Sequence, residues 1–553
     1  MTFSRALLLQ GDLLALPAVA ICLTTWLAIG LIEFSFWATR AIIPALARVL
    51  RTTGRAVWLG LEQDPLGAAA KRFVDPVVRR ARSLLPLWRW IANRFRAGHR
   101  GIGLTVSIAA GLLSLFALLY LSTEIGDPRS TVSGFDLRVG ELSSRLVVSG
   151  ERRFMAALTA VGKTRSILVL LLALSGGMVL ARARRAAVTL IAISGLSSLL
   201  VTIFKALHHR PRPAFGQLVE TSTSFPSGHS AAALALAAGI LVVAWKTGVR
   251  RLSLVAAGVL PLGFLVGYSR AYLNIHWISD VAAGWLIAII SATTVLAIDL
   301  WLNAKNRPQP SRRWPLVAAA IVMVGVAVFS GINGSRIGFP KLSKAKIELA
   351  TGDVTDLLRH RPRFSETLFG RRMEPLGLVI VTSDDNLIGA ITEGGWALAE
   401  PPTLGRLAKT YRAGLKGRKD PTAPVTPTFF DTRIQDIAIQ RQLPGTGVKA
   451  RHHARLWRLP VRTTDGCRIW VGTASLDDRV EWTIRTVLPN HHIAPAIDVE
   501  REFIVRNLSA TGLLTDSGKI RIVPPTLGTN AAGDPFFTDG NAALLEQIGG
   551  CVV

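Results

Sequence analysis

Three short segments between residues 205 and 280 carry the side chains of this sequence that are best suited to chemistry on a phosphate group. They read KALHHRPRP (205–213), PSGH (226–229) and SRAYLNIHWISD (269–280). Together they provide basic side chains, imidazoles, a serine–glycine turn and a carboxylate. Basic side chains hold phosphate oxygens, and an imidazole can attack phosphorus. Each segment lies at the end of an apolar stretch, so the sequence predicts a phosphorylated lipid as the substrate.

The first segment provides two cations at the end of a hydrophobic helix. Lys205 precedes Arg212 by seven residues, and Pro211 and Pro213 stop the helix and fix an extended turn. The arginine can grip phosphate oxygens with its planar fork, and the lysine can act as a point charge. Taken alone, such residues are more typical of basic side chains that snorkel to the membrane surface from a helix end.

The second segment precedes an apolar helix, for which Ser227 or Ser230 can serve as the N-cap. Successive N–H groups at a helix start form an anion site, and Gly228 allows a ligand to approach closely. His229 lies where it can protonate a leaving oxygen. An ordinary turn followed by an interfacial histidine explains this segment equally well.

The third segment is the most specific, because His276 and Asp280 are four residues apart near the start of an apolar helix. That spacing puts the carboxylate against the imidazole if the helical turn begins by His276. A carboxylate that accepts the Nδ1 proton fixes the tautomer and leaves Nε2 free to attack, while Arg270 can neutralise the oxygens of the transferring group. A His–Asp pair that packs two helices is the structural alternative. Ionisable pairs at the ends of apolar helices are costly, which favours function.

In order and spacing, the three segments resemble the signature of the type 2 phosphatidic acid phosphatases, the PAP2 superfamily, which reads K-x6-RP, PSGH and SR-x5-H-x3-D. All signature positions are present, and the resemblance covers residues 102–302, for which it implies a six-helix core. It implies that His276 forms a phosphohistidine, that Asp280 orients it, and that His229 is the general acid. It also implies catalysis without a metal or another cofactor. The residues that it assigns to the phosphoryl oxygens are Lys205, Arg212, Ser227, Gly228 and Arg270.

A second resemblance covers residues 376–508, which are similar to the LssY-type C-terminal domain and contain DDNLIGAITEGGW, HHARLW and HHIAPAIDVERE. It implies no activity. The local patterns predict a strand over 376–382, a helix capped by Asp384 or Asp385, a hairpin over 454–476 and a helix from Glu500 to Leu508. The histidine pairs of this region are His452/His453 and His491/His492. Alternating strand positions send neighbours to opposite faces, so these histidines fit a surface or a hairpin better than a metal site.

The composition indicates a membrane protein with room for a further domain. The 553 residues are half hydrophobic and carry a formal net charge of +28. Such basicity is typical of nucleic-acid-binding proteins, but residues 1–333 hold 35 Lys and Arg against 13 Asp and Glu, whereas residues 334–553 hold 29 against 23. The excess therefore lies among the hydrophobic segments, where positive loops orient helices in a membrane, and we expect no nucleic-acid partner.

A helix needs about 20 apolar residues to span a bilayer, and segments of roughly this length recur along the first part of the chain. They cover 13–37, 102–123, 160–181, 186–207, 228–245, 252–270, 280–302 and 314–332. Basic connections then place the loops that follow alternate spans in the cytoplasm and leave 124–159 as an extracytoplasmic loop. This topology puts all three phosphate segments, and everything after residue 333, on the periplasmic side of a bacterial inner membrane. The N-terminal topology stays open, because a single span at 13–37 conflicts with Arg5.

The fold class that follows is an all-α polytopic membrane domain, with a six-helix core and flanking spans, followed by a soluble α/β domain. Cys467 and Cys551 can pair in an oxidising compartment or remain free thiols. The predicted domains are an N-terminal anchor and basic amphipathic connector (1–101), the phosphatase core (102–302), an extra transmembrane helix (303–333) and the LssY-type domain (334–553).

The predicted function is hydrolysis of phosphate monoesters or pyrophosphate esters of lipids: undecaprenyl pyrophosphate, phosphatidic acid or phosphatidylglycerophosphate. The predicted partners are this phospholipid or polyprenyl phosphate and the membrane lipids. Two alternatives remain, namely a phosphotransferase that moves the group between lipids, for example onto lipid A, and a binding or assembly protein with a vestigial core. A vanadium haloperoxidase, a soluble member of the superfamily, does not fit a polytopic chain.

Overall fold

The computed structural model describes most of the chain from residue 101 onward. The described residues are 101–145, 149–214, 216, 222–247, 249, 251–302, 314–335, 348–349, 354–400, 404–416, 418–446, 450–481 and 490–551. The predicted anchor at 13–37 and the basic connector up to residue 100 lie outside them.

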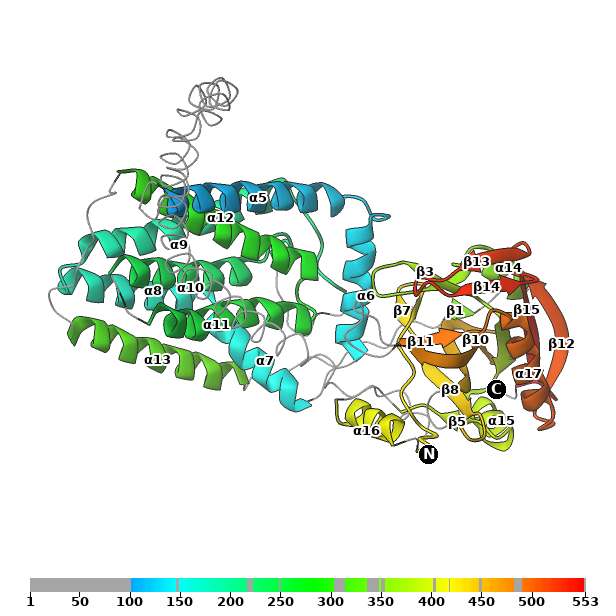
Figure 1. The fold of residues 1–553 in the computed structure, drawn as a ribbon. Coiled ribbons are helices and arrows are strands. Elements are labelled where there is room, and N and C mark those ends of the chain that lie inside the picture. Colours follow the sequence, from blue (N-terminus) through cyan, green and yellow to red (C-terminus); the bar gives the residue numbers. More distant parts are fainter. Residues whose placement is uncertain are drawn as a thin grey trace, which may run out of the picture.

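The first half of the described chain is a bundle of apolar helices (Figure 1). Their bounds are α5 Ile102–Glu124, α7 Ser149–Val161, α8 Thr164–Leu180, α9 Arg184–Leu207, α10 Gly228–Lys246, α11 Leu252–Tyr272, α12 Ile278–Leu302 and α13 Trp314–Ser335. Within the described residues, five helices are long and apolar enough to cross a membrane, or six if the bent pair α7–α8 counts as one span. The predicted all-α polytopic domain is confirmed.

The helices are apolar on more than one side because some faces meet other helices and others meet lipid. On the outside, Leu113, Phe116 and Phe329 are each 71% exposed, as expected for side chains that face hydrocarbon. The inner helix α10 is rich in alanine, and its small side chains pack against α9, α11 and α12. Small residues of this kind allow close approach of transmembrane helices.

The stretch 124–159 is not the plain loop that the charge pattern predicted. It forms the short helix α6 Thr131–Arg145 and the helix α7, which bends by 52° into α8 at residues 162–163. Helix α6 carries too many polar residues to register as a span, which is why hydropathy missed it. In Figure 1 it lies across the end of the bundle, between the bundle and the second domain.

The second domain is α/β, as predicted, and is built on a sheet that has nine strands in the described residues. The main path runs β12-β15-β4-β10-β9-β8-β5, with β1 added to β9 and β11 to β10. These strands are β1 Glu348–Leu349, β4 Leu378–Thr382, β5 Ala397–Leu398, β8 Ile437–Gln442, β9 Arg451–Arg462, β10 Arg468–Glu481, β11 Asn490–Ile493, β12 Leu514–Arg521 and β15 Asn541–Gln547.

Smaller elements surround this sheet. They are the four-stranded sheet of β2 Phe364–Glu366, β3 Arg372–Pro375, β6 Phe429–Phe430 and β7 Arg433–Ile434, the ribbon of β13 Thr526–Thr529 and β14 Pro535–Thr538, and the helices α14 Val354–Arg359, α15 Asp384–Glu393, α16 Leu404–Leu415 and α17 Ile497–Ser509. The main sheet is covered on both faces, and central strand β4 shows why its residues form an unbroken apolar run. Leu378 and Ile380 join the core beneath α15 and α17, whereas Val379 and Val381 join the core on the opposite face. A strand buried on both sides has no polar alternation.

Most local predictions in this domain are confirmed. The strand at 376–382 is β4, the hairpin is β9–β10, and the helix from Glu500 to Leu508 lies within α17. The predicted cap of the helix after β4 is wrong, because the N-cap is Ser383, whose hydroxyl accepts from the Asn386 N–H at 3.3 Å. Asp384 and Asp385 occupy the first turn instead, where they favour the helix dipole.

The structure shows the partners of the two cysteines and of the described histidines in this domain. Cys467 and Cys551 form a disulfide between the start of β10 and the chain end. The described histidine side chains of the two pairs are each matched with a carboxylate. His452 contacts Glu500 at 2.7 Å, His453 contacts Asp477 at 3.4 Å, and His492 contacts Asp534.

Candidate active site

The structure brings the three signature segments together at one end of the bundle, the end that faces the second domain (Figure 1). Lys205 ends α9, and Arg212 follows in the connection to α10. Ser227 and Gly228 begin α10, Arg270 lies in the last turn of α11, and His276 precedes α12. Residues separated by up to 75 positions therefore share one face because the helices alternate in direction.

The His276–Asp280 pair predicted from sequence spacing is present. His276 Nδ1 lies 3.3 Å from Asp280 Oδ2, although α12 begins only at Ile278, two residues after the histidine. The same oxygen accepts the Trp277 N–H at 2.9 Å and the Ser224 hydroxyl. Asp280 is fully buried, so these donors hold its carboxylate in one orientation.

The other ring nitrogen of His276 faces Arg212. Arg212 Nη1 lies 3.1 Å from His276 Nε2 and donates to the Ile275 carbonyl at 3.0 Å, while its Nε donates to the Ser222 carbonyl at 2.8 Å. A guanidinium can only donate, so the contact assigns Nε2 as an acceptor and Nδ1–H as the donor to Asp280. This tautomer keeps Nε2 unprotonated, so its lone pair can attack once Arg212 exchanges its hydrogen bond to Nε2 for one to the phosphoryl oxygens.

The remaining signature cations and His229 surround this pair. Arg270 is 1% exposed and donates to the Thr159 hydroxyl at 3.1 Å, while Lys205 donates to the Thr223 carbonyl. His229 interacts electrostatically with Arg270, His276 and Arg212, so the two imidazoles and these two arginines belong to one site. Such a cluster of positive charge is suited to a phosphate dianion.

Ser227 is the N-cap of α10, which decides between the two predicted caps. Its hydroxyl accepts from the Ser230 N–H at 3.4 Å and the Ser230 hydroxyl at 2.8 Å. Its own N–H donates to the Asp280 carbonyl at 3.0 Å, which ties the starts of α10 and α12 together. The helices meet so closely here that a Cβ on Gly284 would lie 2.6 Å from the Ser227 carbonyl oxygen. Binding of phosphate by Ser227 and Gly228 remains a prediction.

Sequence reasoning missed four residues of this site, namely Asp136, Lys163, Arg210 and Ser224. Arg210 lies inside the first segment, where it counted only as a spacer, yet its Nη1 donates to Asp280 Oδ1 at 2.8 Å. Its Nη2 donates to Asp136 Oδ2 at 2.7 Å, so one guanidinium joins two carboxylates. Burial raises the pKa of Asp136, against the lowering influence of Arg210 and Ser279. Asp136 gave no signal in the sequence, because it falls in the stretch that was interpreted as a loop.

Lys163 reaches the site through the bend between α7 and α8. A Cβ on the preceding Gly162 would lie 3.3 Å from His229 Cδ2, and the exposed Lys163 interacts electrostatically with His229. The lysine is therefore a further cation near His229.

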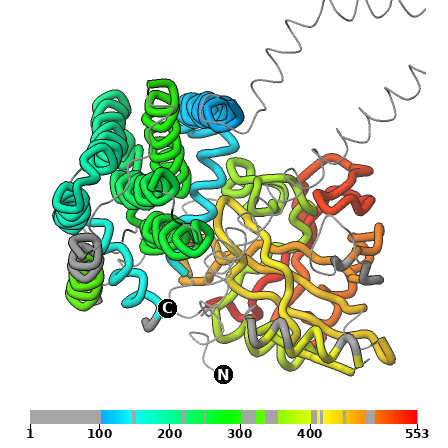
Figure 2. The backbone as a smooth tube through the Cα atoms, turned by 60° about the vertical axis from the view of Figure 1, so that its left-hand side comes forward, coloured from blue at the N-terminus to red at the C-terminus, as the bar shows by residue number. Residues whose placement is uncertain are grey.

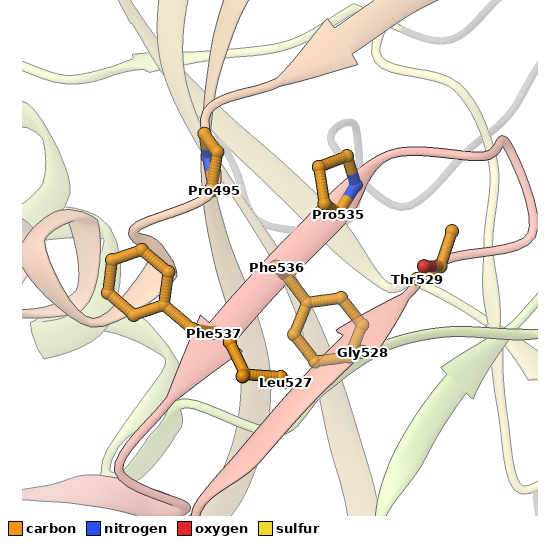
Figure 3. Close-up of a pocket in the computed structure, with 7 residues that line it drawn as sticks. All are labelled: Pro495, Leu527, Gly528, Thr529, Pro535, Phe536 and Phe537. Atoms are coloured by element: carbon orange, nitrogen blue, oxygen red, sulfur yellow. The ribbon is translucent and has the colours of Figure 1, made fainter.

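A separate open pocket lies in the second domain and contains none of the signature residues (Figure 3). It measures about 370 Å³ and is lined by the β13–β14 ribbon and Pro495. Phe536 points inward to the apolar core, whereas Phe537 is 47% exposed. Its lining contains no basic or imidazole side chain, in contrast to the cluster of cations and imidazoles in the bundle.

Comparisons with known proteins show what the chain is similar to. Residues 186–304 match the family model of the PAP2 superfamily, and residues 358–542 match that of the LssY C-terminus. Phosphatidylglycerophosphatase B of Bacillus subtilis is 31% identical over 151 residues, which cover 26% of this chain and 73% of that protein.

Two solved structures are also similar. The PAP2-type phosphatidylglycerolphosphate phosphatase of Bacillus subtilis is 25% identical, with a TM-score of 0.33, over 35% of this chain and 98% of that one. LpxE of Aquifex aeolicus is 26% identical, with a TM-score of 0.24, over 29% of this chain and 93% of that one. From the signature segments, the family models and the curated relative, the chain belongs to the PAP2 superfamily and carries an LssY-type C-terminal domain.

Proposed function

We propose that this protein is an integral-membrane phosphatase that hydrolyses phosphate or pyrophosphate esters of lipids through a phosphohistidine on His276. The observation that carries the proposal is the pairing of His276 with Asp280 on one nitrogen and Arg212 on the other. This arrangement holds an unprotonated Nε2 beside a cation, at the end of helices whose outer faces suit lipid. A phosphorylated lipid can then present its headgroup to the site while its chains stay in the membrane.

The proposed reaction has two steps. In the first, Nε2 of His276 attacks phosphorus, the bond to the leaving oxygen breaks, and His229 gives that oxygen a proton. In the second, His229 takes a proton from water, the water oxygen attacks phosphorus, and the P–N bond breaks to release phosphate. Lys205, Arg212 and Arg270 balance the charge on the phosphoryl oxygens in both steps, which is our reason for expecting catalysis without a metal.

The substrate class is supported by the curated relative, which is a phosphatidylglycerophosphatase. We expect the substrate to be phosphatidylglycerophosphate, phosphatidic acid or undecaprenyl pyrophosphate. The test is phosphate release from each of these lipids by the purified full-length protein in mixed micelles. The wild type should hydrolyse at least one of these lipids, and the His276→Ala variant should hydrolyse none of them. A folded wild-type protein that releases phosphate from no lipid would refute the proposal, and a phosphorylated acceptor lipid in place of free phosphate would identify a phosphotransferase instead.

We further propose that the site and the C-terminal domain face the periplasm of a bacterial inner membrane. Two observations support this orientation. The basic residues Arg182, Arg184 and Arg185 lie at the opposite end of the bundle from the site, as expected for a cytoplasmic loop. The Cys467–Cys551 disulfide fits an oxidising compartment.

Thiol labelling in intact cells tests this orientation. In the Cys22→Ser variant, Cys467 and Cys551 should resist alkylation until a reductant is added, and the Cys22→Ser/Cys551→Ser variant should leave Cys467 reactive in denaturant without reductant. Free thiols at both positions in freshly lysed wild-type cells would contradict a periplasmic domain.

A further inference from the structure

Helix α6 contacts the active site on one face and the C-terminal domain on the opposite face. Figures 1 and 2 both show it between the bundle and the strand-rich domain. Its polar residues are not exposed as they would be in a solvated connector, because Asp136 is 1% exposed and Arg138 is 7% exposed. Burial of charge without a partner is costly, so each of these side chains must be matched by its surroundings.

The face toward the bundle holds the catalytic pair through Arg210. Asp136 accepts the Ser279 N–H at 3.0 Å and Arg210 Nη2 at 2.7 Å. Arg210 Nη1 then donates to Asp280 Oδ1 at 2.8 Å and to the Ser279 hydroxyl at 2.8 Å. One turn further along α6, Gly140 lies close to Asn274 and Trp277, the residues on either side of the nucleophile's segment.

The two carboxylate oxygens of Asp280 therefore have different hydrogen-bond partners. Arg210 occupies Oδ1, which leaves Oδ2 for His276, Trp277 and Ser224. The guanidinium is planar and rigid, so the position of Asp136 sets the angle at which Arg210 meets Asp280. A shift of α6 would therefore turn the carboxylate that orients His276.

The opposite face of α6 is attached to the C-terminal domain. Arg138 forms an ion pair with Glu366 on β2, and Phe135 stacks on Phe369 with ring centroids 5.3 Å apart. At the other end of the helix, Arg145 contacts Asp436 at 2.7 Å. These contacts alternate along α6 with those toward the bundle, so the helix is clamped between the two domains.

We propose that Asp136 and Arg210 are positioning residues of the phosphatase, and that the LssY-type domain holds the His276–Asp280 pair in register by fixing α6. The inference rests on the proposed function, and it gives the C-terminal domain a role in catalysis that requires no chemistry of its own. The domain acts as a support for the active site, through the path from Glu366 and Phe369 to α6, and from Asp136 to Arg210 and Asp280.

The first test changes the carboxylate on α6. Asp136→Asn removes the charge that holds Arg210 and keeps the shape of the side chain. We expect kcat to fall about 10- to 100-fold while KM changes less than about twofold, because the variant misplaces the nucleophile without touching the phosphate-binding cations. Arg210→Lys should retain more activity than Arg210→Met. The matched control is Asp127→Asn, an exposed carboxylate just before α6, which should behave as the wild type.

The second test changes no fully buried residue, so that it depends less on how well the buried variants fold: Glu366 is half-buried, and Phe369, Asp356 and Leu527 are exposed. Glu366→Gln/Phe369→Ala, the clamp variant, removes the ion pair with Arg138 and the ring that stacks on Phe135, and it leaves the Arg145–Asp436 contact in place. The control Asp356→Asn/Leu527→Ala removes a carboxylate and an apolar side chain elsewhere on the same domain. Phe369 is 64% exposed and Leu527 is 87% exposed. The clamp variant should lose about tenfold in kcat at unchanged KM, and combining it with Asp136→Asn should cost less than the product of the two losses.

The outcomes separate this inference from the proposed function. An inactive wild type refutes both. Active wild-type and control proteins, together with a clamp variant and an Asp136→Asn variant of wild-type kcat, refute the inference and leave the phosphatase intact. A rise in KM as large as the fall in kcat also refutes the coupling. So does a loss in the combined variant that equals the product of the two single losses, because either result shows that α6 does not act through the nucleophile.

Discussion

Replacing His276 by alanine is expected to lower kcat/KM on the lipid substrate by about 10⁴-fold or more, because a nucleophile that forms a covalent intermediate has no substitute in the site. The fold should survive, since the side chain is held mainly by Asp280 and Arg212 at the end of the bundle. Initial rates of phosphate release by purified variants, normalised to protein that elutes as the wild type does, measure the loss.

The matched control for this substitution is His209→Ala. His209 lies in the first segment but is exposed, and it belongs to neither the signature nor the contacts of the site. The control should keep most of the wild-type rate. If His276→Ala kept more than about a hundredth of that rate, His276 would not be the nucleophile.

Replacing His229 by glutamine is the second large change, and its effect should depend on the leaving group. A general acid contributes roughly 10²- to 10⁴-fold when the leaving oxygen is a poor one, so hydrolysis of a lipid phosphate should fall by that factor. An activated aryl phosphate leaves as a phenolate without needing a proton, so its first step should be affected far less. Both reactions are followed side by side on the same preparation.

The two-step reaction adds a sharper signature for this variant. Because His229 also activates the water in the second step, His229→Gln should release one equivalent of phenolate per site in a burst and then turn over slowly. Rapid-mixing kinetics with the aryl phosphate measure the burst. Equal losses with both substrates and no burst would remove His229 from the role of acid and base.

The signature residues could be predicted to lie in one site because their spacing coincides with the ends of apolar helices. Each apolar run is long enough for one helix through the bundle. Successive helices therefore alternate in direction, which brings the three segments to the same end. The His276–Asp280 contact also followed from local spacing. Within the C-terminal domain, strand β4 and hairpin β9–β10 were predictable for a similar reason, since their patterns and turn residues are local.

The missed features depend on contacts between residues far apart in the chain. Asp136 meets Arg210 across 74 residues, and no local pattern records such a distance. For the same reason the sequence left open whether Cys467 and Cys551, which are 84 residues apart, form a disulfide. Helix α6 was missed because its polarity hid it from a search for spans, although its charges are satisfied by two domains at once. The misplaced cap before α15 arose because Ser383, Asp384 and Asp385 are all good caps, and only the backbone shows which one precedes the helix.

Trapping the phosphoenzyme tests the central claim most directly. Full-length protein is mixed with ³²P-labelled lipid substrate, quenched within milliseconds in alkaline detergent, and separated from lipid on a denaturing gel. We predict a label on the protein that is stable in base, lost in acid and absent in His276→Ala, and peptide mapping should place it on His276. Turnover by the wild type with no protein-bound label under any quench, or a label that persists in His276→Ala, would contradict the phosphohistidine mechanism.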